Sequence, residues 1–388
     1  MTTTVLGAGY AGIMAANRLA GRGEEVVLVT PHPWFLERIR LHSVASGARA
    51  DARHELRAML NPAIQLVNDT VRRIGEDELE LAHGGRVRYE TLLYAVGSGA
   101  HPGRDSASVA GSNAEPDSDA VAVHRVAAEP DALALRAALL ARPSAPVTIV
   151  GAGFTGIELA GALHAAGRQV RVLSASEPTR RAGRAQLRQL RKSGVEVTTG
   201  RRFDFAEASP EEITVDAAGF AVPSLAADSG LPVDARGRLI VDDTLTVTGH
   251  PRILGAGDAV WVNSPVAAHL RPACATALPM GAYAADVIRA RREGGSVEPL
   301  SIGYALQCVD LGAGRGHVQF VHADDSERSL AVTGRAGGLL KETISRMTVR
   351  WLEQERDRAG KYSWPAGPAT PAQSAQPDRP EHSGRLAE

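Results

Sequence analysis

The chain has 388 residues, with 43 basic and 44 acidic side chains and a formal net charge of -1. This balance excludes the strongly positive surface by which proteins hold nucleic acid, so nucleic acid is not an expected partner. Apolar residues make up 44% and charged residues 22% of the chain, as in folded globular proteins, and the length favours two or three domains.

Cysteine content and the termini indicate the compartment. The two cysteines, Cys274 and Cys308, form no CxxC or CxxxxC motif, so neither a disulfide scaffold nor a redox dithiol is encoded. No signal peptide is recognisable at the start, and no apolar run reaches the roughly 18 residues needed to span a bilayer. We therefore expect a cytoplasmic protein in a reducing compartment. No cluster of metal ligands is apparent either.

Residues 3–30 have the pattern strand, glycine turn, helix, strand. In the turn, Gly7 permits a tight bend, Gly9 lets a diphosphate approach the backbone, and Gly12 lets the helix pack on the strand. The first N–H groups of the helix would face the phosphates. The predicted dinucleotide-binding residues of this motif are Gly7, Ala8, Gly9, Tyr10, Ala11 and Gly12.

The end of the second strand departs from the usual pattern. Thr30 stands where an acidic residue normally binds the ribose. A hydroxyl still hydrogen-bonds a ribose, although more weakly than a carboxylate does. Thr30 is therefore retained as a cofactor-binding candidate.

The following segments alternate in hydrophobicity. Residues 64–67, 79–81 and 87–89 predict an antiparallel ribbon, and residues 92–96 predict a buried strand. Residues 98–120 are rich in Gly, Ser, Asp and Ala and predict a linker or domain crossing.

A second unit of the same kind follows. A helix around 132–140 leads to a strand at 146–150, a second glycine motif, a helix and a strand that ends at Leu173. Two such units in one chain imply two dinucleotides, which is a more specific indication than either motif alone. The predicted binding residues here are Gly151, Gly153, Phe154, Thr155 and Gly156.

Residues after the second unit bear on which nicotinamide nucleotide binds. Ser174 occupies the position where an NADH-specific site places an acid, so a 2′-phosphate would not be repelled. Three arginines lie downstream. They form either a phosphate clamp or an ordinary solvated helix face; they are Arg180, Arg181 and Arg184.

Two further features lie in the last third of the chain. A short apolar strand at 252–256 ends in Gly257 and Asp258, and an acid at such a position needs a hydrogen-bond donor such as a polyol hydroxyl. An Ala-rich helix is expected within 271–292. Because proline is tolerated in the first turn of a helix, Pro279 places the helix start near Thr276.

Taken together, the four motifs resemble those of flavoproteins with two dinucleotide-binding domains, and within that superfamily those of type II (alternative, non-pumping) NADH:quinone oxidoreductases. The resemblance covers roughly residues 3–360. It implies FAD at the first motif and NADH or NADPH at the second. It also implies that Ala95 and Gly97 lie on the strand returning from the FAD domain, and that Asp258 holds the ribityl chain.

The fold implied is α/β, with two nested Rossmann-type domains and a small C-terminal segment. The expected organisation is an FAD-binding domain in two parts, an NAD(P)H-binding domain between them, an interface segment and a disordered tail. The corresponding residues are 1–120 and 236–300, 121–235, 301–364, and 365–388.

The resemblance also implies catalytic residues. Glu158 is similar to the glutamate that reaches toward nicotinamide and flavin, although a carboxylate in a first helical turn is also ordinary. Arg40 and His42 lie where disulfide reductases of the superfamily carry their cysteine pair. They would face the isoalloxazine ring, or else form a solvated basic face of an amphipathic helix.

The helix after Asp258 would direct its positive N-terminal end toward the pyrimidine edge of the reduced flavin. Ala277 and Leu278 are therefore further cofactor-binding candidates. The family usually has a glutamine pair here, and this chain has Ala277–Gly281 instead, a departure that leaves the acceptor open. Met280 is expected to pack rather than to react.

A last apolar stripe has helical spacing: Leu340, Ile344, Met347 and Trp351. We expect this stripe to be buried against the protein's own core or a second copy, because one Trp among charges of both signs makes a poor membrane face. Peripheral membrane contact and a homodimer both stay open.

The function expected is transfer of a hydride from NAD(P)H to FAD and of electrons to a quinone or quinone-like small molecule. Two alternatives are a tailoring flavoenzyme acting on an aromatic or quinoid metabolite, and an FAD-binding interaction protein with slow redox turnover.

Overall fold

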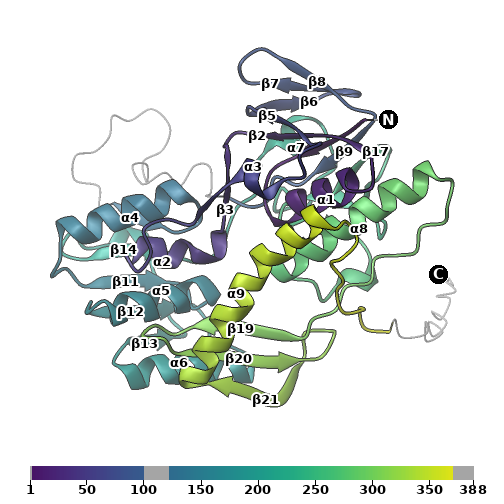
Figure 1. Ribbon diagram of the computed structural model, residues 1–388. Coiled ribbons are helices and arrows are strands. Elements are labelled where there is room, and N and C mark those ends of the chain that lie inside the picture. The colour runs from purple at the N-terminus through teal and green to yellow at the C-terminus, as the bar shows by residue number, and fades with distance from the viewer. Residues whose placement is uncertain (1, 100–121, 370–388) are drawn as a thin grey trace, which may run out of the picture.

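A computed structural model describes residues 2–99 and 122–369 (Figure 1). Most of the linker expected at 98–120 and the tail from residue 370 onward lie outside the described residues. In the described part of the chain, the strands form five sheets, of eight, five, three, three and two strands.

The first sheet has eight strands in the order β18-β15-β16-β17-β9-β1-β2-β5. Its centre is parallel, and both faces of β1 and β2 are buried, as parallel sheets require. The chain leaves this sheet after β9 and returns to it at β15. The strands are β1 (Thr2–Leu6), β2 (Glu25–Thr30), β5 (Gln65–Asn68), β9 (Thr91–Tyr94), β15 (Leu239–Val241), β16 (Thr246–Val247), β17 (His250–Gly255) and β18 (Val260–Val262).

Two helices pack together beside this sheet, α1 (Tyr10–Ala20) and α8 (Cys274–Arg292). Their close approach depends on Gly281, because a Cβ there would lie 2.2 Å from the carbonyl oxygen of Ala11. The first glycine motif and the Asp258 segment therefore meet around the same helix pair.

The sequence predicts residues 64–67 as part of an antiparallel ribbon, but the strand at this position does not belong to one. It is β5, which extends the first sheet parallel to β2. The antiparallel ribbon is formed instead by β6 (Val71–Ile74), β7 (Glu78–Leu81) and β8 (Arg86–Arg88). Alternation identified the strands but not their partners, since pairing is decided by tertiary contacts.

The second sheet is entirely parallel, in the order β10-β14-β11-β12-β13, with a separate apolar core. It carries the second glycine motif between β11 and α5. Its elements are β10 (Val123–Arg125), α4 (Glu129–Ala141), β11 (Val147–Val150), α5 (Phe154–Ala165), β12 (Val170–Ser174), α6 (Arg181–Ser193), β13 (Glu196–Thr199) and β14 (Ile213–Asp216).

The third sheet is antiparallel and is formed by β19 (Leu306–Asp310), β20 (Gly316–Val321) and β21 (Glu327–Thr333). It leads into the long helix α9 (Gly334–Asp357). Figure 1 shows α9 running from this sheet toward α1, and it contacts both β20 and α1. One helix thus joins the C-terminal sheet to the first domain.

The buried face of α9 differs from the expected stripe. The face is formed by Gly337, Ser345, Thr348, Leu352 and Glu355, whereas Leu340, Ile344 and Trp351 are half-buried and Met347 is 38% exposed. Polar residues can be buried here because they have partners: Thr348 donates to the Ser345 carbonyl (2.8 Å) and Glu355 pairs with Arg18 (3.1 Å). The stripe is therefore displaced around the helix from the face in contact with the core.

The remaining elements are short: β3 (Trp34–Leu36), β4 (Arg53–Glu55), α2 (Leu41–Ala45), α3 (Leu56–Met59), α7 (Leu225–Asp228), and the 3₁₀ turns at Arg38–Arg40, Phe205–Glu207 and Pro265–Ala267. Helix α2 packs against α4 and α5. Residues 34–45 therefore connect the first domain to the second.

The tail had been predicted to be disordered from Pro365 onward, but residues 365–369 are described and bonded. The Pro365 carbonyl accepts from Gly303 N–H (2.8 Å), and Gly367 N–H donates to Ser301 Oγ (2.9 Å). These hydrogen bonds, one to a backbone carbonyl and one to a side-chain hydroxyl, order a segment whose composition alone predicts no ordered structure. No helix in the described ranges has the length and apolar character needed to cross a membrane.

Candidate active site

The first and third glycines of both motifs are required by the protein itself. Gly7 has φ +106°, and a Cβ on it would lie 2.4 Å from the Ala95 carbonyl oxygen. A Cβ on Gly12 would lie 1.9 Å from the Gly7 carbonyl oxygen. In the second motif, a Cβ on Gly151 (φ +111°) would lie 2.9 Å from the Ala217 carbonyl oxygen, and a Cβ on Gly156 would lie 2.0 Å from the Gly151 carbonyl oxygen. Any side chain at these positions would push the helix away from the strand.

The middle glycines differ. Gly9 and Gly153 precede α1 and α5 as their N-caps, and a Cβ on either would meet no protein atom within 4 Å. No side chain caps either helix, so their first N–H groups are left for another partner. Open space in front of uncapped helix ends fits the diphosphates of FAD and NAD(P)H.

The other residues predicted at the FAD motif gather around the end of β1. Tyr10, Ala11 and Thr30 are buried, and Ala8 is half-buried. Gly97 has φ +68° and open space beside it. The Thr30 carbonyl accepts from Asp69 N–H (3.0 Å).

Asp258 follows β17 and lies beside the start of α8. It accepts a hydrogen bond from Ser98 Oγ (3.2 Å). Burial raises the pKa of its carboxyl, although the Arg38 guanidinium opposes that rise. Gly257 and Asp258 line a cavity of about 250 Å³ together with Arg271, Thr276 and Met280. A carboxylate on such a cavity can hold the hydroxyls of a polyol chain.

Helix α8 begins at Cys274, two residues before the expected start near Thr276, and Pro279 is not in its first turn as predicted. Pro279 is the sixth residue, within the helix. Burial among α1 and the first sheet holds the helix together despite the missing N–H. The Ala277 N–H donates to the Ala273 carbonyl (2.9 Å) and is therefore not free to bind a cofactor. The unpaired N–H groups at the start of α8 belong to residues one turn earlier. Leu278 and Met280 are buried, and Met280 packs as expected.

The predicted catalytic residues Glu158 and His42 lie together, and Lys341 of α9 joins them. The Lys341 ammonium lies 3.0 Å from Glu158 Oε1, and His42 Nδ1 lies 3.5 Å from Glu158 Oε2. Glu158 Oε1 also accepts from Asp310 N–H (3.1 Å). Glu158 is therefore a buried, fully partnered carboxylate and not an ordinary solvated residue of a first helical turn.

Electrostatics in this cluster follow from burial and pairing. Burial pushes the pKa of Glu158 upward, but Lys341 and His42 outweigh it, and the net pKa is lowered. Burial likewise pulls the pKa of Lys341 down, but Glu158 outweighs that effect and the net pKa is raised. For His42, burial dominates over the attraction of Glu158 and lowers the pKa. At neutral pH the cluster is thus an ion pair beside a neutral imidazole.

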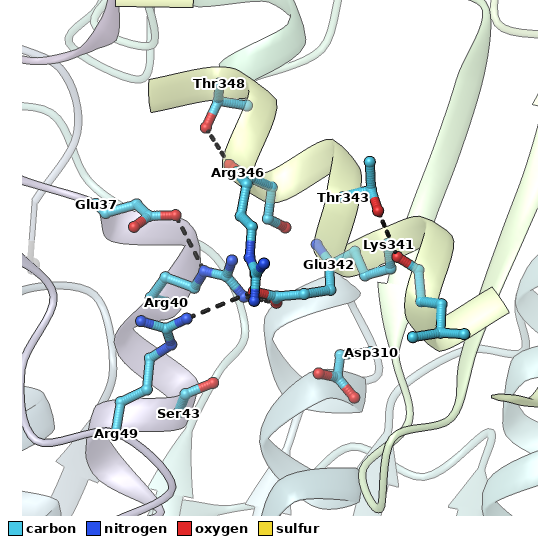
Figure 2. A network of polar contacts seen from close by, with 12 residues as sticks. Glu37, Arg40, Ser43, Arg49, Asp310, Lys341, Glu342, Thr343, Arg346 and Thr348 are labelled. Carbon is cyan, nitrogen blue, oxygen red and sulfur yellow. Dashed lines mark hydrogen bonds and ion pairs between the residues drawn. The ribbon is translucent and has the colours of Figure 1, made fainter. Parts of the chain in front are cut away.

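Arg40 is also buried and lies between two carboxylates. Its Nε donates to Glu37 Oε1 (3.0 Å) and its Nη1 to Glu342 Oε2 (2.5 Å) (Figure 2). Glu342 follows Lys341 directly on α9. Arg40 and His42 therefore do not form a solvated basic face: α9 bonds Arg40 through Glu342, and its Lys341 shares Glu158 with His42.

The three arginines after Ser174 are exposed, as a solvated face would be, but each of them also has a partner in the protein. Arg180 pairs with Asp325 (2.9 Å), Arg181 donates to the Arg328 carbonyl (2.8 Å), and Arg184 donates to carbonyls of its own loop. Two of them thus tie the second domain to the β20–β21 hairpin. In the second motif itself, Phe154 and Thr155 are exposed.

Lys341 and Glu342 were not predicted from the sequence. The spacing of Lys341 with Ser345, Thr348 and Leu352 marks the buried face of α9, and that pattern could have identified it. The neighbouring apolar stripe obscured this pattern because it has the same period.

Comparisons with known proteins agree with this arrangement. The family model for pyridine nucleotide-disulphide oxidoreductases matches residues 1–281. An NADH dehydrogenase-like protein of Mycobacterium tuberculosis is 26% identical over 381 residues, covering 88% of this chain and 92% of the relative.

Two solved structures are similar in fold. The sulfide:quinone oxidoreductase of Aquifex aeolicus has a TM-score of 0.73 at 16% identity and covers 91% of this chain and 92% of that chain. NDH2 of Plasmodium falciparum, solved with NADH, has a TM-score of 0.72 at 13% identity, and the match covers 94% of this chain and 99% of that chain. At these identities the likeness establishes the fold.

Proposed function

We propose that this chain, which belongs to the pyridine nucleotide-disulphide oxidoreductase family, passes its electrons to a quinone or a quinone-like small molecule. As a member of that family it is an oxidoreductase that uses FAD with NADH or NADPH. The predicted α/β fold with two Rossmann-type domains and the predicted cofactors are confirmed. FAD, when bound, takes a hydride from the nicotinamide and passes two electrons onward.

The proposal rests on the buried ionic cluster of His42, Glu158 and Lys341. A quinone gains negative charge as it is reduced and takes up protons with its electrons. Such an acceptor needs a fixed cation and a group that can hand over a proton. Lys341 is a cation at every pH of interest, because its pKa is raised by Glu158 against the effect of burial.

The neutral His42 can hold a proton at a defined atom. A carboxylate at 3.5 Å from Nδ1 favours the tautomer with its proton there. Nε2 is then free to accept from the Ser43 hydroxyl, 3.1 Å away. Ser43, His42 and Glu158 thus form one line of polar contacts that fixes the proton of His42 at Nδ1.

An external acceptor is also favoured by the cysteines. Cys274 and Cys308 are both free, and they lie on α8 and β19. Residues 34–45, between β3 and the end of α2, contain no cysteine. The electrons therefore have no disulfide to reduce at that position, and a molecule must dock to receive them.

The names of similar proteins agree with this choice. One structure of the same fold is a sulfide:quinone oxidoreductase, and the bacterial relative is NADH dehydrogenase-like. They support a quinone-type acceptor without specifying the quinone.

The test is to measure the two half-reactions separately under anaerobic conditions by stopped-flow absorbance of the flavin. We expect His42→Gln and Arg40→Gln each to slow reoxidation by a soluble quinone about 10-fold or more, with reduction by NAD(P)H unchanged. Arg346→Gln is the matched control, since Arg346 shares Glu342 with Arg40 but its side chain is 76% exposed.

The proposal fails if quinones reoxidise the wild-type protein no faster than dissolved oxygen does. Fast reduction by NAD(P)H would then favour a tailoring enzyme for an aromatic or quinoid metabolite. Slow reduction by either nucleotide would favour an FAD-binding interaction protein.

A further inference from the structure

A second charged cluster lies where the loop before α8 meets the beginning of α5. Its centre is Asp325, in the turn between β20 and β21, with φ +67° and only 1% exposure. Asp325 Oδ2 lies 2.9 Å from Arg180 Nη1 and 3.1 Å from Arg271 Nε. A hairpin turn is normally solvated, so the burial of this carboxylate indicates that it holds the arginines in place.

Arg271 is held on other sides as well. Its guanidinium carbon lies 4.7 Å from the ring centroid of Tyr304 and 5.5 Å from that of Phe154. Its backbone N–H donates to the Tyr304 hydroxyl (2.9 Å). Phe154 is the first residue of α5, directly after Gly153. Arg271 therefore stands beside the uncapped helix end of the second glycine motif.

The donors of Arg271 are only partly used. Within residues 2–99 and 122–369, its guanidinium donates through Nε alone, and both Nη nitrogens lack a hydrogen-bond partner. Two guanidinium groups face one carboxylate in this cluster, so it keeps a net positive charge. A stacked guanidinium with two free N–H₂ groups has the geometry that binds phosphate oxygens in pairs.

We propose that Arg271 binds the diphosphate of NADH or NADPH at the start of α5, and that Asp325 and Tyr304 are the residues that position it. The open space at Gly153 receives the same diphosphate from the other side. Arg180 completes the cluster by sharing Asp325. The donor site would thus include a residue from the loop before α8, which carries no glycine motif. This inference depends on NAD(P)H as donor and not on the identity of the acceptor.

The experiment compares the FAD-loaded wild-type protein with Arg271→Gln, using ADP-ribose as a probe that carries the diphosphate but no nicotinamide. We expect the dissociation constants of ADP-ribose, NADH and NADPH all to rise about 10-fold or more, because a charge-assisted hydrogen-bond pair is lost. KM for the nucleotide should rise with kcat nearly unchanged. Flavin content is measured on the same samples, because Arg271 also lines the cavity beside Asp258 and its loss could affect FAD as well.

Two further variants separate binding from structure. Arg328→Gln removes one positive charge from the same hairpin. It should leave ADP-ribose binding unchanged, because Arg328 is exposed and its side chain is not part of the cluster of Asp325, Arg180 and Arg271. Arg271→Lys keeps the charge without the fork, so its affinity should fall between wild type and Arg271→Gln. If Arg271→Gln does not fold, Arg271→Lys alone must weaken ADP-ribose for the proposal to stand.

The proposal is overturned if ADP-ribose binds the Arg271 variants as tightly as it binds the wild type. It is also overturned if the variants lose FAD while ADP-ribose affinity is unchanged, because Arg271 would then serve the flavin.

Discussion

Replacing Lys341 with Met should leave Glu158 as an uncompensated buried carboxylate. In the folded protein the ammonium lies 3.0 Å from Glu158 Oε1, and the two side chains are 11% and 10% exposed. Removing one partner of a buried ion pair costs about 3–5 kcal/mol. Lys341→Met should therefore lower the free energy of unfolding by about that amount, measured in urea at a fixed FAD concentration.

The pH dependence gives a sharper test than the loss itself. In the wild type the pKa of Glu158 is lowered from 4.5, so its contribution is present above pH 4.5 and is lost as the pH falls further. In Lys341→Met the carboxylate has lost its cation, and the folded state gains a proton on Glu158 or His42 more readily than the unfolded state. The variant should then gain stability as the pH falls from about 7 toward 5.

A double-mutant cycle completes this test. Glu158→Gln in the Lys341→Met background removes the stranded charge, and we expect it to recover about 2 kcal/mol or more of the loss. Additive effects of the two substitutions, together with a pH slope equal to that of the wild type, would refute the buried ion pair.

Four other outcomes are expected. Gly9→Val should fold but purify without the flavin absorbance, whereas Gly12→Val should fail to fold, because a Cβ there lies 1.9 Å from the Gly7 carbonyl oxygen; a yellow Gly9→Val protein would contradict the first assignment. Gly153→Val should keep FAD and lose flavin reduction by NAD(P)H, which anaerobic titration reports. Burial lowers the pKa of His42 from 6.5, so the unfolding free energy should fall below pH 6.5 in the wild type and fall less in His42→Gln, as urea titrations at several pH values would show. Ser174 leaves a 2′-phosphate unopposed, so flavin bleaching by NADPH should be comparable to that by NADH, and a preference for NADH beyond roughly 100-fold, about 2.7 kcal/mol, would argue against this.

The sequence determined the two dinucleotide-binding units because their chemistry is local. Gly12 and Gly156 are fixed by contacts with Gly7 and Gly151 inside their own units, and the left-handed φ of Gly7 and Gly151 belongs to the turn itself, although these two also meet the distant residues Ala95 and Ala217. Features within a turn are encoded by spacing, and the spacing was sufficient to predict an α/β fold with two bound dinucleotides, whereas the family resemblance implied that these are FAD and NAD(P)H. Glu158 was recognised as a candidate for the same reason, since it follows its glycine motif directly.

Tertiary structure decided what surrounds those units, because the partners are far apart along the chain. Glu158 meets Lys341, which is 183 residues later, and Arg271, before α8, meets Asp325 in the turn between β20 and β21. The start of α8 also depended on burial, which holds the helix intact through Pro279. Local propensity describes the cost of a proline or of a buried charge in isolation, and only the packed neighbours of that residue determine whether the cost is offset.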